Sequence, residues 1–182
     1  MWSRRHLIAA LGAAPAVAVL AGCGFRPVYG RTSYDPNVSE ELATVGVSSI
    51  PDRAGQLVRN ALVARLNPTG EPSRPRYRLN VSVVSTEGQE ALQTDQTATR
   101  AIDFYTVAFA LYDKKGTRIA AGGFNRQLSY DYVEQYYANV SAKDDLDRRA
   151  AEQIAEQIAV EVASYFERAA KARAKAQAAG SK

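Results

Sequence analysis

The thiol and the imidazole, the side chains that most often act as nucleophile and base, occur once each in this chain of 182 residues. The imidazole belongs to His6 and the thiol to Cys23, which ends the tetrapeptide Leu20-Ala21-Gly22-Cys23. A thiolate and an imidazole are the usual parts of a cysteine nucleophile site, and both bind zinc. What these two residues can do depends on whether the N-terminal segment that contains them is kept.

The N-terminus has the three parts of a secretory signal. A basic start with Arg4 and Arg5 is followed by an uncharged apolar stretch and then by small residues before Cys23. The stretch from Leu7 to Gly22 is shorter than the roughly 20 residues that a membrane-spanning helix needs. We therefore expect residues 1–22 to be a signal peptide that is removed. The paired arginines also resemble a twin-arginine export signal, and an ordinary secretory route is the alternative.

The tetrapeptide Leu20-Ala21-Gly22-Cys23, where this signal ends, resembles the lipobox of bacterial lipoproteins. In a lipobox the cysteine thiol receives a diacylglycerol, and the cysteine becomes the new N-terminal residue after cleavage. By that resemblance Cys23 is lipidated, and this covalent lipid is the only added group that we expect, with no other cofactor. A buried free cysteine behind an ordinary signal is the alternative. Gly24 stands where lipoproteins retained in the inner membrane often carry aspartate, so the expected location is the outer membrane.

Loss of the signal leaves a mature chain without histidine and without a free thiol. Such a chain cannot form a Ser–His or Cys–His nucleophile site, nor the usual imidazole or thiolate zinc site, so we predict no catalytic and no metal-binding residues. A pair of carboxylates of the glycosidase kind stays formally possible. The acidic residues, however, lie mostly in expected turns or on the polar side of the last helix.

The net charge of +4 at pH 7 falls to +2 when Arg4 and Arg5 leave with the signal. The remaining excess is concentrated in the last 15 residues, which contain no acid. The rest of the mature chain is mildly acidic, so the overall charge does not indicate a nucleic-acid partner. The basic residues of this C-terminal segment are Arg168, Lys171, Arg173, Lys175 and Lys182.

Turn residues and periodicity divide the mature chain into a tether and one domain. Residues 23–42 contain Pro27, Gly30 and Pro36, and we expect a lipidated tether without regular structure. A strand is expected over 43–50 and a helix over 56–66, where apolar residues recur every four positions. Residues 43–168 form the domain, and residues 169–182 are expected to be a basic, alanine-rich tail without a packing face.

Three further strands are expected to form a meander. Tyr77, Leu79 and Val81 alternate with polar residues, the pattern of a strand buried on one face. Longer strands follow over 97–112 and 117–130, joined by a tight hairpin at 113–116. The pair Gly122-Gly123 indicates either a bulge or a close backbone approach within the last strand.

A long helix is expected to begin with Ser141 as its cap and to run with one apolar face to about residue 168. The cluster Tyr132, Tyr136 and Tyr137 lies just before it and suits either the rim of a core or a protein interface. The order β-α-β-β-β-α predicts an α+β fold. We expect a two-layer sandwich with about four mostly antiparallel strands, two helices on one face, and the first two strands parallel.

The lipobox, the segment Gly24-Phe25-Arg26-Pro27-Val28-Tyr29-Gly30, and the layout of strand, helix, meander and C-terminal helix resemble the LptE family. LptE proteins are lipopolysaccharide-assembly lipoproteins of Gram-negative bacteria. The resemblance implies a non-enzymatic protein that plugs the outer-membrane β-barrel LptD, binds lipopolysaccharide and helps deliver it to the outer leaflet. It implies no nucleic-acid partner.

Lipid A carries phosphates, so exposed cations on one sheet face or hairpin tip are candidates to bind lipopolysaccharide. These candidates are Lys114, Lys115, Arg118, Arg76 and Arg78. The alternative is that lysines are common in hairpins and that arginines on a strand discourage aggregation through its edge.

Two other classes of function stay open at this point. One is a general scaffold lipoprotein of another envelope complex, which the same anchor and fold would allow. The other is a carbohydrate-active or lipid-modifying enzyme, which would need two carboxylates that converge in a cleft.

Overall fold

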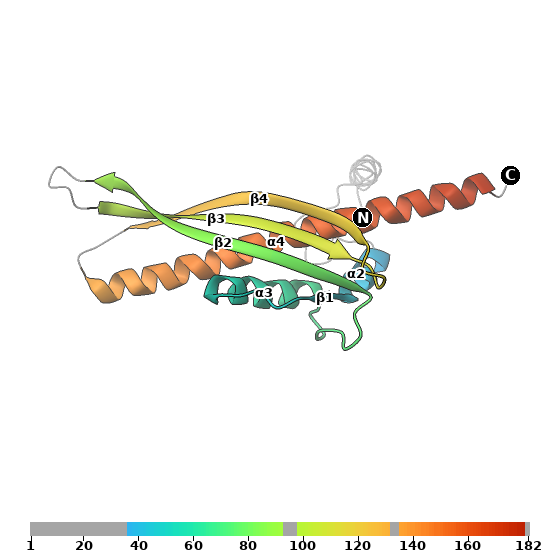
Figure 1. The fold of residues 1–182 in the computed structure, drawn as a ribbon, viewed down its shortest axis with the longest axis horizontal. Coiled ribbons are helices and arrows are strands. Elements are labelled where there is room, and N and C mark those ends of the chain that lie inside the picture. The colour runs from blue at the N-terminus through green and yellow to red at the C-terminus, as the bar shows by residue number, and fades with distance from the viewer. Residues whose placement is uncertain (1–35, 93–97, 132–134, 181–182) are drawn as a thin grey trace, which may run out of the picture. The chain divides into compact units, whose positions relative to one another are not determined.

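A computed structural model describes residues 36–92, 98–131 and 135–180 (Figure 1). The signal peptide, Cys23 and most of the expected tether therefore lie outside the described residues. The elements are, in chain order, α2 (Pro36–Ala43), β1 (Val45–Val47), α3 (Arg53–Leu66), β2 (Tyr77–Leu92), β3 (Ala98–Tyr112), β4 (Arg118–Asp131) and α4 (Tyr136–Gly180).

The four described strands form one sheet in the order β1-β2-β3-β4. β1 pairs with β2 in parallel, with Val45 opposite Tyr77 and Val47 opposite Leu79. The other two pairings are antiparallel and follow the chain. This mixed sheet with its helices confirms the α+β prediction, including the parallel first pair joined through α3.

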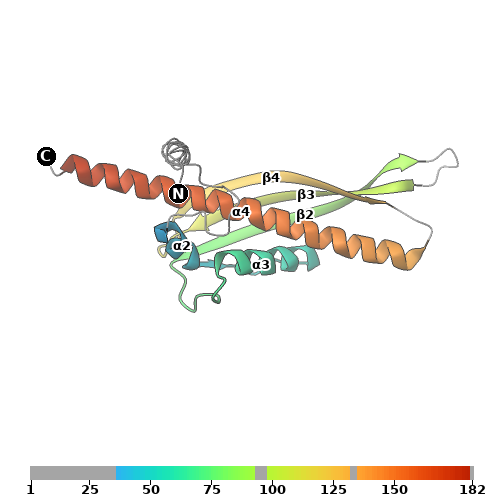
Figure 2. The ribbon, with the colours of Figure 1, turned by 180° about the vertical axis from the view of Figure 1, so that it is seen from behind.

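One face of the sheet is covered by α3 and α4, and no helix formed by the described residues lies on the other face (Figures 1 and 2). The core lies between the two layers. It receives alternate residues of the strands, as the alternation of Tyr77, Leu79 and Val81 predicts. The buried residues that meet them come from the apolar stripes of both helices, among them Val58, Leu62, Leu66, Ile154, Ile158, Val162 and Phe166.

Glycines of the meander stand where another residue would be strained or too large, in the β3–β4 hairpin and in β4 beside β3. Gly116 ends the β3–β4 hairpin with φ 79°, a conformation that favours glycine. At Gly122 an added Cβ would lie 2.6 Å from the Cζ of Phe109, so the ring of Phe109 occupies the space that a side chain would fill. At Gly123 an added Cβ would lie 2.9 Å from the backbone oxygen of Val107, so the predicted close backbone approach is confirmed. The register shift between β3 and β4 lies beside Leu111 and Tyr112, so the alternative of a bulge at the glycine pair is wrong.

The chain is more helical than predicted at both ends of the domain. Residues 36–43 form α2, although 36–42 were expected to belong to an irregular tether and 43 to the first strand. Proline is well tolerated in the first turn of a helix, and Val38 and Leu42 are buried one turn apart. The strand expected over 43–50 is restricted to Val45–Val47. None of the helices in the described part of the chain combines the length and the apolar composition needed to cross a membrane.

The last helix is longer than predicted at both ends. α4 begins at Tyr136 and not after Ser141, and it continues to Gly180 through the segment expected to be an unstructured tail. Alanine, lysine, arginine and glutamine have high helix propensity, so a helix persists where no apolar stripe is left. Beyond Phe166 no residue of α4 is buried.

Candidate functional site

The cations predicted to bind phosphate lie around one end of the sheet. Arg78 of β2 and Arg118 of β4 are both register partners of Tyr112 in β3. Directly opposed residues of neighbouring strands project from the same face, so this row places a guanidinium on each side of Tyr112. Lys114 and Lys115 follow in the hairpin, and both are exposed.

A hollow of about 350 Å³ lies at this end of the sheet and brings three of the five candidates together. Arg76, Arg78 and Lys114 line it, whereas Lys115 and Arg118 lie outside it. Its other lining residues are Pro75, Tyr77, Asn80, Tyr112, Asp113 and Gly116. We name these five cations with Tyr112 the basic sheet end.

Most of the positive charge at the basic sheet end has no counter-charge in the described part of the chain. Arg76 lies 3.5 Å from an Oε1 of Glu41 and 5.7 Å from the centre of the Tyr77 ring. No carboxylate of the described residues forms an ion pair with Arg78, Lys114, Lys115 or Arg118. Asp113 is used by the hairpin, because its Oδ1 accepts the backbone N–H groups of Lys115 and Thr117. The site can therefore bind an anionic group without first breaking an ion pair at four of its cations.

The sheet face away from the helices continues from the basic sheet end and is largely polar. Asn80, Ser82, Thr106 and Asn125 are exposed on it. Two larger apolar side chains are exposed as well, Val84 at 58% and Phe104 at 46%. We name this surface the open sheet face; it offers hydrogen-bonding groups with a few apolar anchors, which suits a wet protein interface.

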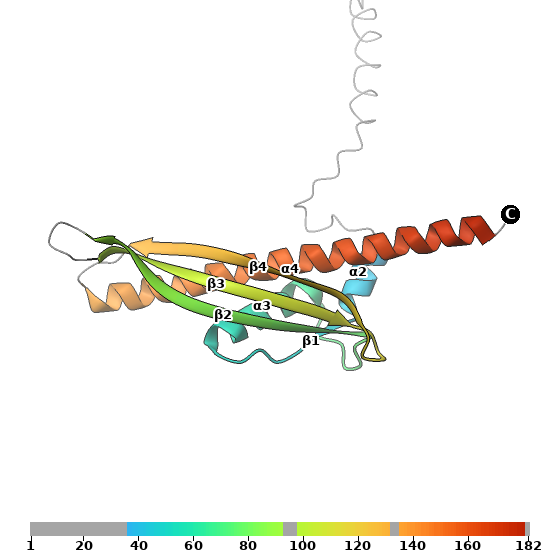
Figure 3. The same cartoon turned by 45° about the horizontal axis from the view of Figure 1, so that its top comes forward.

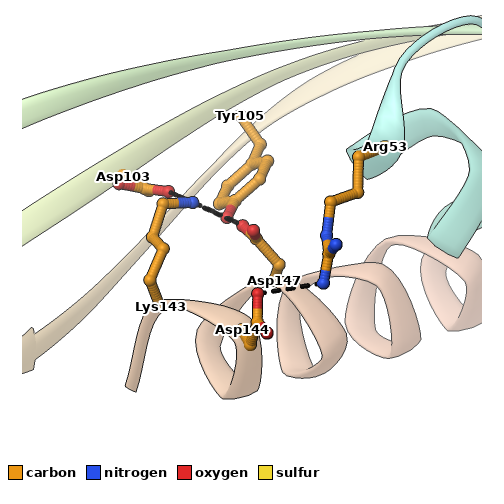
Figure 4. A network of polar contacts seen from close by, with 6 residues as sticks. All are labelled: Arg53, Asp103, Tyr105, Lys143, Asp144 and Asp147. Carbon is orange, nitrogen blue, oxygen red and sulfur yellow. Dashed lines mark hydrogen bonds and ion pairs between the residues drawn. The ribbon is translucent and has the colours of Figure 1, made fainter. Parts of the chain in front are cut away.

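A second polar cluster lies farther along β3, on the side that faces α4 (Figure 4). The Nζ of Lys143 is 2.7 Å from the Oδ2 of Asp103 and 2.7 Å from the Oδ1 of Asp147. The hydroxyl of Tyr105 lies 2.7 Å from that same oxygen of Asp147 and 3.1 Å from the Oδ2 of Asp103, so its single proton is donated mainly to Asp147. These four residues, the buried network, join the start of α4 to the middle of the sheet.

The buried network favours protonated Lys143 and Tyr105. Burial raises the pKa of Tyr105 far above its ordinary value, and the hydrogen bond to Asp147 and the charges of both aspartates raise it further. Burial opposes the charge of Lys143, but hydrogen bonds to Asp103 and Asp147 and their charges outweigh it, so the pKa of Lys143 is also raised. One lysine thus holds two carboxylates together inside the protein.

Asp103 and Asp147 are two acids that converge, as the carboxylate-enzyme alternative requires. Asp103, however, is 1% exposed, and its Oδ2 is occupied by Lys143. Neither aspartate lines the hollow at the basic sheet end. The arrangement fits attachment of α4 to the sheet better than attack on a substrate. Within the described residues no three potential metal ligands of the His, Cys, Asp and Glu types come together.

Sequence reasoning missed the buried network, although one signal was present. Asp103 lies two residues from Tyr105 and two from Ala101, so the period of the strand places it on the core face. A buried aspartate needs a partner, and a lysine one turn before another aspartate, as in Lys143 and Asp147, supplies one. The expectation that the acids lie mostly in turns or on the polar side of the last helix is therefore wrong for this pair.

The expected tyrosine cluster is only partly described. Tyr136 and Tyr137 begin α4, and their rings meet edge to face at 5.8 Å. They are 74% and 85% exposed, which excludes the rim of the core for these two and leaves an interface as the open reading. Tyr132 lies outside the described residues.

Comparison with known proteins agrees with this layout. The family model described as "LptE: Lipopolysaccharide-assembly" matches residues 42–162. The fold is similar to that of a candidate lipoprotein from Caulobacter crescentus CB15, with 25% identity and a TM-score of 0.60, over 76% of this chain and 98% of that one. It is also similar to a minor lipoprotein from Acinetobacter baumannii, with 18% identity and a TM-score of 0.50, over 66% of this chain and 90% of that one. A search of curated proteins finds no match.

Proposed function

Since this chain belongs to the LptE lipopolysaccharide-assembly family, we propose that it is an outer-membrane lipoprotein that binds inside the LptD β-barrel and assists lipopolysaccharide transport. In this proposal Cys23 carries the lipid anchor and no residue is catalytic. The protein acts through two surfaces, the basic sheet end and the open sheet face.

The observation that carries the lipopolysaccharide part of the proposal is the gathering of unpaired cations around Tyr112. Arg78 and Lys114 line one hollow, and Arg118 projects from the same row of the sheet. A guanidinium binds a phosphate through two parallel hydrogen bonds, and an ammonium adds a compact charge. The phosphates of lipid A are the ligand that this arrangement fits.

The observation that supports the barrel part is that none of the helices in the described part of the chain covers the second face of the sheet (Figure 3). The long strands β2, β3 and β4 expose polar side chains there, with Val84 and Phe104 as apolar contacts. The lumen of a large outer-membrane barrel is polar and wet, so a polar sheet face fits its wall without burying unpaired charge.

Charge reversal tests the lipopolysaccharide part. The double variant Arg78→Glu with Lys114→Glu should bind purified lipopolysaccharide at least tenfold more weakly than wild type, because two attractive contacts become repulsive. The matched control is Arg148→Glu with Arg149→Glu, which makes the same charge change on α4 away from the hollow. Equal loss in both variants would show that only net charge matters and would refute the assignment of the basic sheet end.

Photo-crosslinking in intact cells tests the barrel part. A crosslinking side chain at Ser82, Thr106 or Asn125 on the open sheet face should join the protein to a large β-barrel protein. The control position is Gln153, which is exposed on α4. A barrel crosslink from Gln153 but from none of the three sheet positions would contradict the proposed surface, and a different envelope protein at those positions would favour the general scaffold.

A further inference from the structure

The last turns of α4 form a helical arm that contributes no buried residue to the fold. Phe166 is the last buried residue of the helix, and the chain stays helical to Gly180. At a rise of 1.5 Å per residue, residues 167–180 extend about 20 Å past the core. Figures 1 and 3 show this end of the helix, in red, projecting beyond the sheet and α3. We name residues 167–180 the C-terminal arm.

Three of the four cations of the C-terminal arm lie on one side of the helix, and its one acidic residue, Glu167, stands at its start. Arg168, Lys171 and Lys175 are spaced three and four residues apart, so they form a stripe on one face of the helix, and all three are exposed. No acidic residue occurs between Arg168 and Gly180. Alanines fill most of the other positions, so the arm has no large apolar face that would insert into a hydrocarbon core or a protein groove.

The fourth cation of the arm is placed differently. Arg173 lies off the stripe and turns back toward the domain, where its guanidinium is 3.8 Å from the Oε1 of Glu41 in α2. Val38 and Leu42 of the same short helix are buried in the core. One cation, near the middle of the arm, therefore contacts α2, while the three cations of the stripe have no ion pair within the described residues.

The length of chain between Cys23 and α2 limits how far the proposed anchor can lie from the helix that Arg173 contacts. α2 starts at Pro36, and 12 residues lie between it and Cys23. A chain of that length spans at most about 45 Å when fully extended. The lipid on Cys23 is therefore within that length of chain from the helix that Arg173 contacts.

We propose that the stripe of the C-terminal arm binds the anionic phospholipid headgroups of the leaflet in which the Cys23 lipid is inserted. The proposal rests on acylation of Cys23, as proposed above, and adds a second, electrostatic contact. Anchoring by a lipid with a polybasic segment is a known physical combination, because the lipid supplies the affinity and the cations hold the protein against the surface. The arm lies on the membrane surface and does not enter it.

The expected strength follows from the charge of the stripe. A lysine or arginine near an anionic membrane contributes about 1 kcal/mol, which corresponds to about a fivefold change in the ratio of bound to free arm. Salt weakens this attraction, since charges separated by more than about 10 Å are largely screened at 0.1 M.

A single label can follow the arm, because the only cysteine of the chain would be blocked by lipid. Ala178 lies three residues after Lys175 on the same side of the helix. The full-length precursor carrying Ala178→Cys is expressed, and the acylated product is purified from membranes and labelled with a fluorophore. It is then placed in vesicles of phosphatidylcholine alone or with phosphatidylglycerol, each containing a headgroup quencher. Quenching should be strong only with phosphatidylglycerol and should fall as salt is added.

Matched substitutions test whether membrane binding depends on the stripe or only on the net charge of the arm. Lys171→Gln and Lys175→Gln should each lower the ratio of bound to free arm about fivefold, whereas Arg173→Gln, which removes the same charge two residues away, should change it less than twofold. Glutamine keeps the helix propensity, and circular dichroism checks the helix. Equal quenching in both lipids, or equal effects of Arg173→Gln and Lys171→Gln, would overturn the proposal.

Two outcomes separate this inference from the proposed function. The vesicles contain neither lipopolysaccharide nor a barrel, so failure of the arm to bind leaves the lipopolysaccharide-assembly role standing. A second labelled thiol would show that Cys23 carries no lipid and would overturn the anchor and the arm proposal together. Quenching that responds to added soluble polyphosphate but not to phosphatidylglycerol vesicles would assign the stripe to another anion and refute membrane binding.

Discussion

The charged side chains around the middle of β3 and those around its last residue differ in burial and in partners. Asp103 is 1% exposed and shares the ammonium of Lys143 with Asp147. Nine residues later, Tyr112 is flanked by Arg78 and Arg118, which are exposed and without a carboxylate partner in the described chain. The comparison teaches that the same residue types serve two purposes. Charges that satisfy one another hold the layers together, whereas charges without partners remain available to a ligand.

The largest effect should come from removing the shared cation of the buried network. In Lys143→Met two carboxylates lose their counter-charge while Asp103 stays in the core, and breaking such a buried pair costs about 3 kcal/mol. Urea unfolding followed by circular dichroism measures the loss of free energy of unfolding. Lipopolysaccharide binding of the folded variant should stay unchanged. A loss below about 1 kcal/mol would place the network among ordinary surface ion pairs.

A smaller loss of stability, again from the buried network, is expected at alkaline pH. The pKa of Lys143 and that of Tyr105 are raised above 10.5 and 10.0, so the folded state binds both protons more tightly than the unfolded state. Their contribution is therefore complete below about pH 10 and is lost as the pH rises further. Urea unfolding of wild type and of Lys143→Met with Tyr105→Phe measures this, because the difference between their free energies of unfolding should shrink between pH 8 and pH 11. A difference that grows over this range would contradict the assignment.

The smallest effect on stability should come from the basic sheet end. Arg78→Ala with Lys114→Ala removes two exposed cations that have no ion pair, so the free energy of unfolding should stay within about 0.5 kcal/mol of wild type. The same urea measurement applies, with lipopolysaccharide binding as the second readout. A loss above 1 kcal/mol with unchanged binding would reverse the comparison, because these cations would then be structural.

Local patterns in the sequence were sufficient to predict most of the sheet. The alternation around Leu79, the hairpin glycine at 116 and the contact of the first helix through Leu62 each follow from neighbours in the chain, and the structure confirms them. The family and the α+β class follow from the order of these elements. The five candidate cations were chosen for their charge and their place on an expected strand face or hairpin, and only the folded structure shows that three of them, Arg76, Arg78 and Lys114, line one hollow.

Features that depend on distant partners were missed. In the sequence Asp103 is a polar residue within a largely apolar strand. Its partner, Lys143, lies about 40 residues later in α4, so only the folded chain brings the two together. Pro36 predicts a break in regular structure, because proline interrupts a helix everywhere except in its first turn. In the structure it stands in the first turn of α2, and burial of Leu42 in the core stabilises that helix. The arm beyond Ala169 has no apolar stripe, so periodicity fails there and intrinsic propensity is the only guide.

The length of the strands limits how a β-barrel can enclose the sheet. β2 and β3 contain 16 and 15 residues, and at about 3.3 Å per residue each is about 50 Å long. The apolar band of an outer-membrane barrel is about 25 Å tall. A barrel that surrounds the middle of this sheet therefore leaves strand on both sides of the membrane band, so a single protein can present different chemistry to the two compartments that the barrel connects.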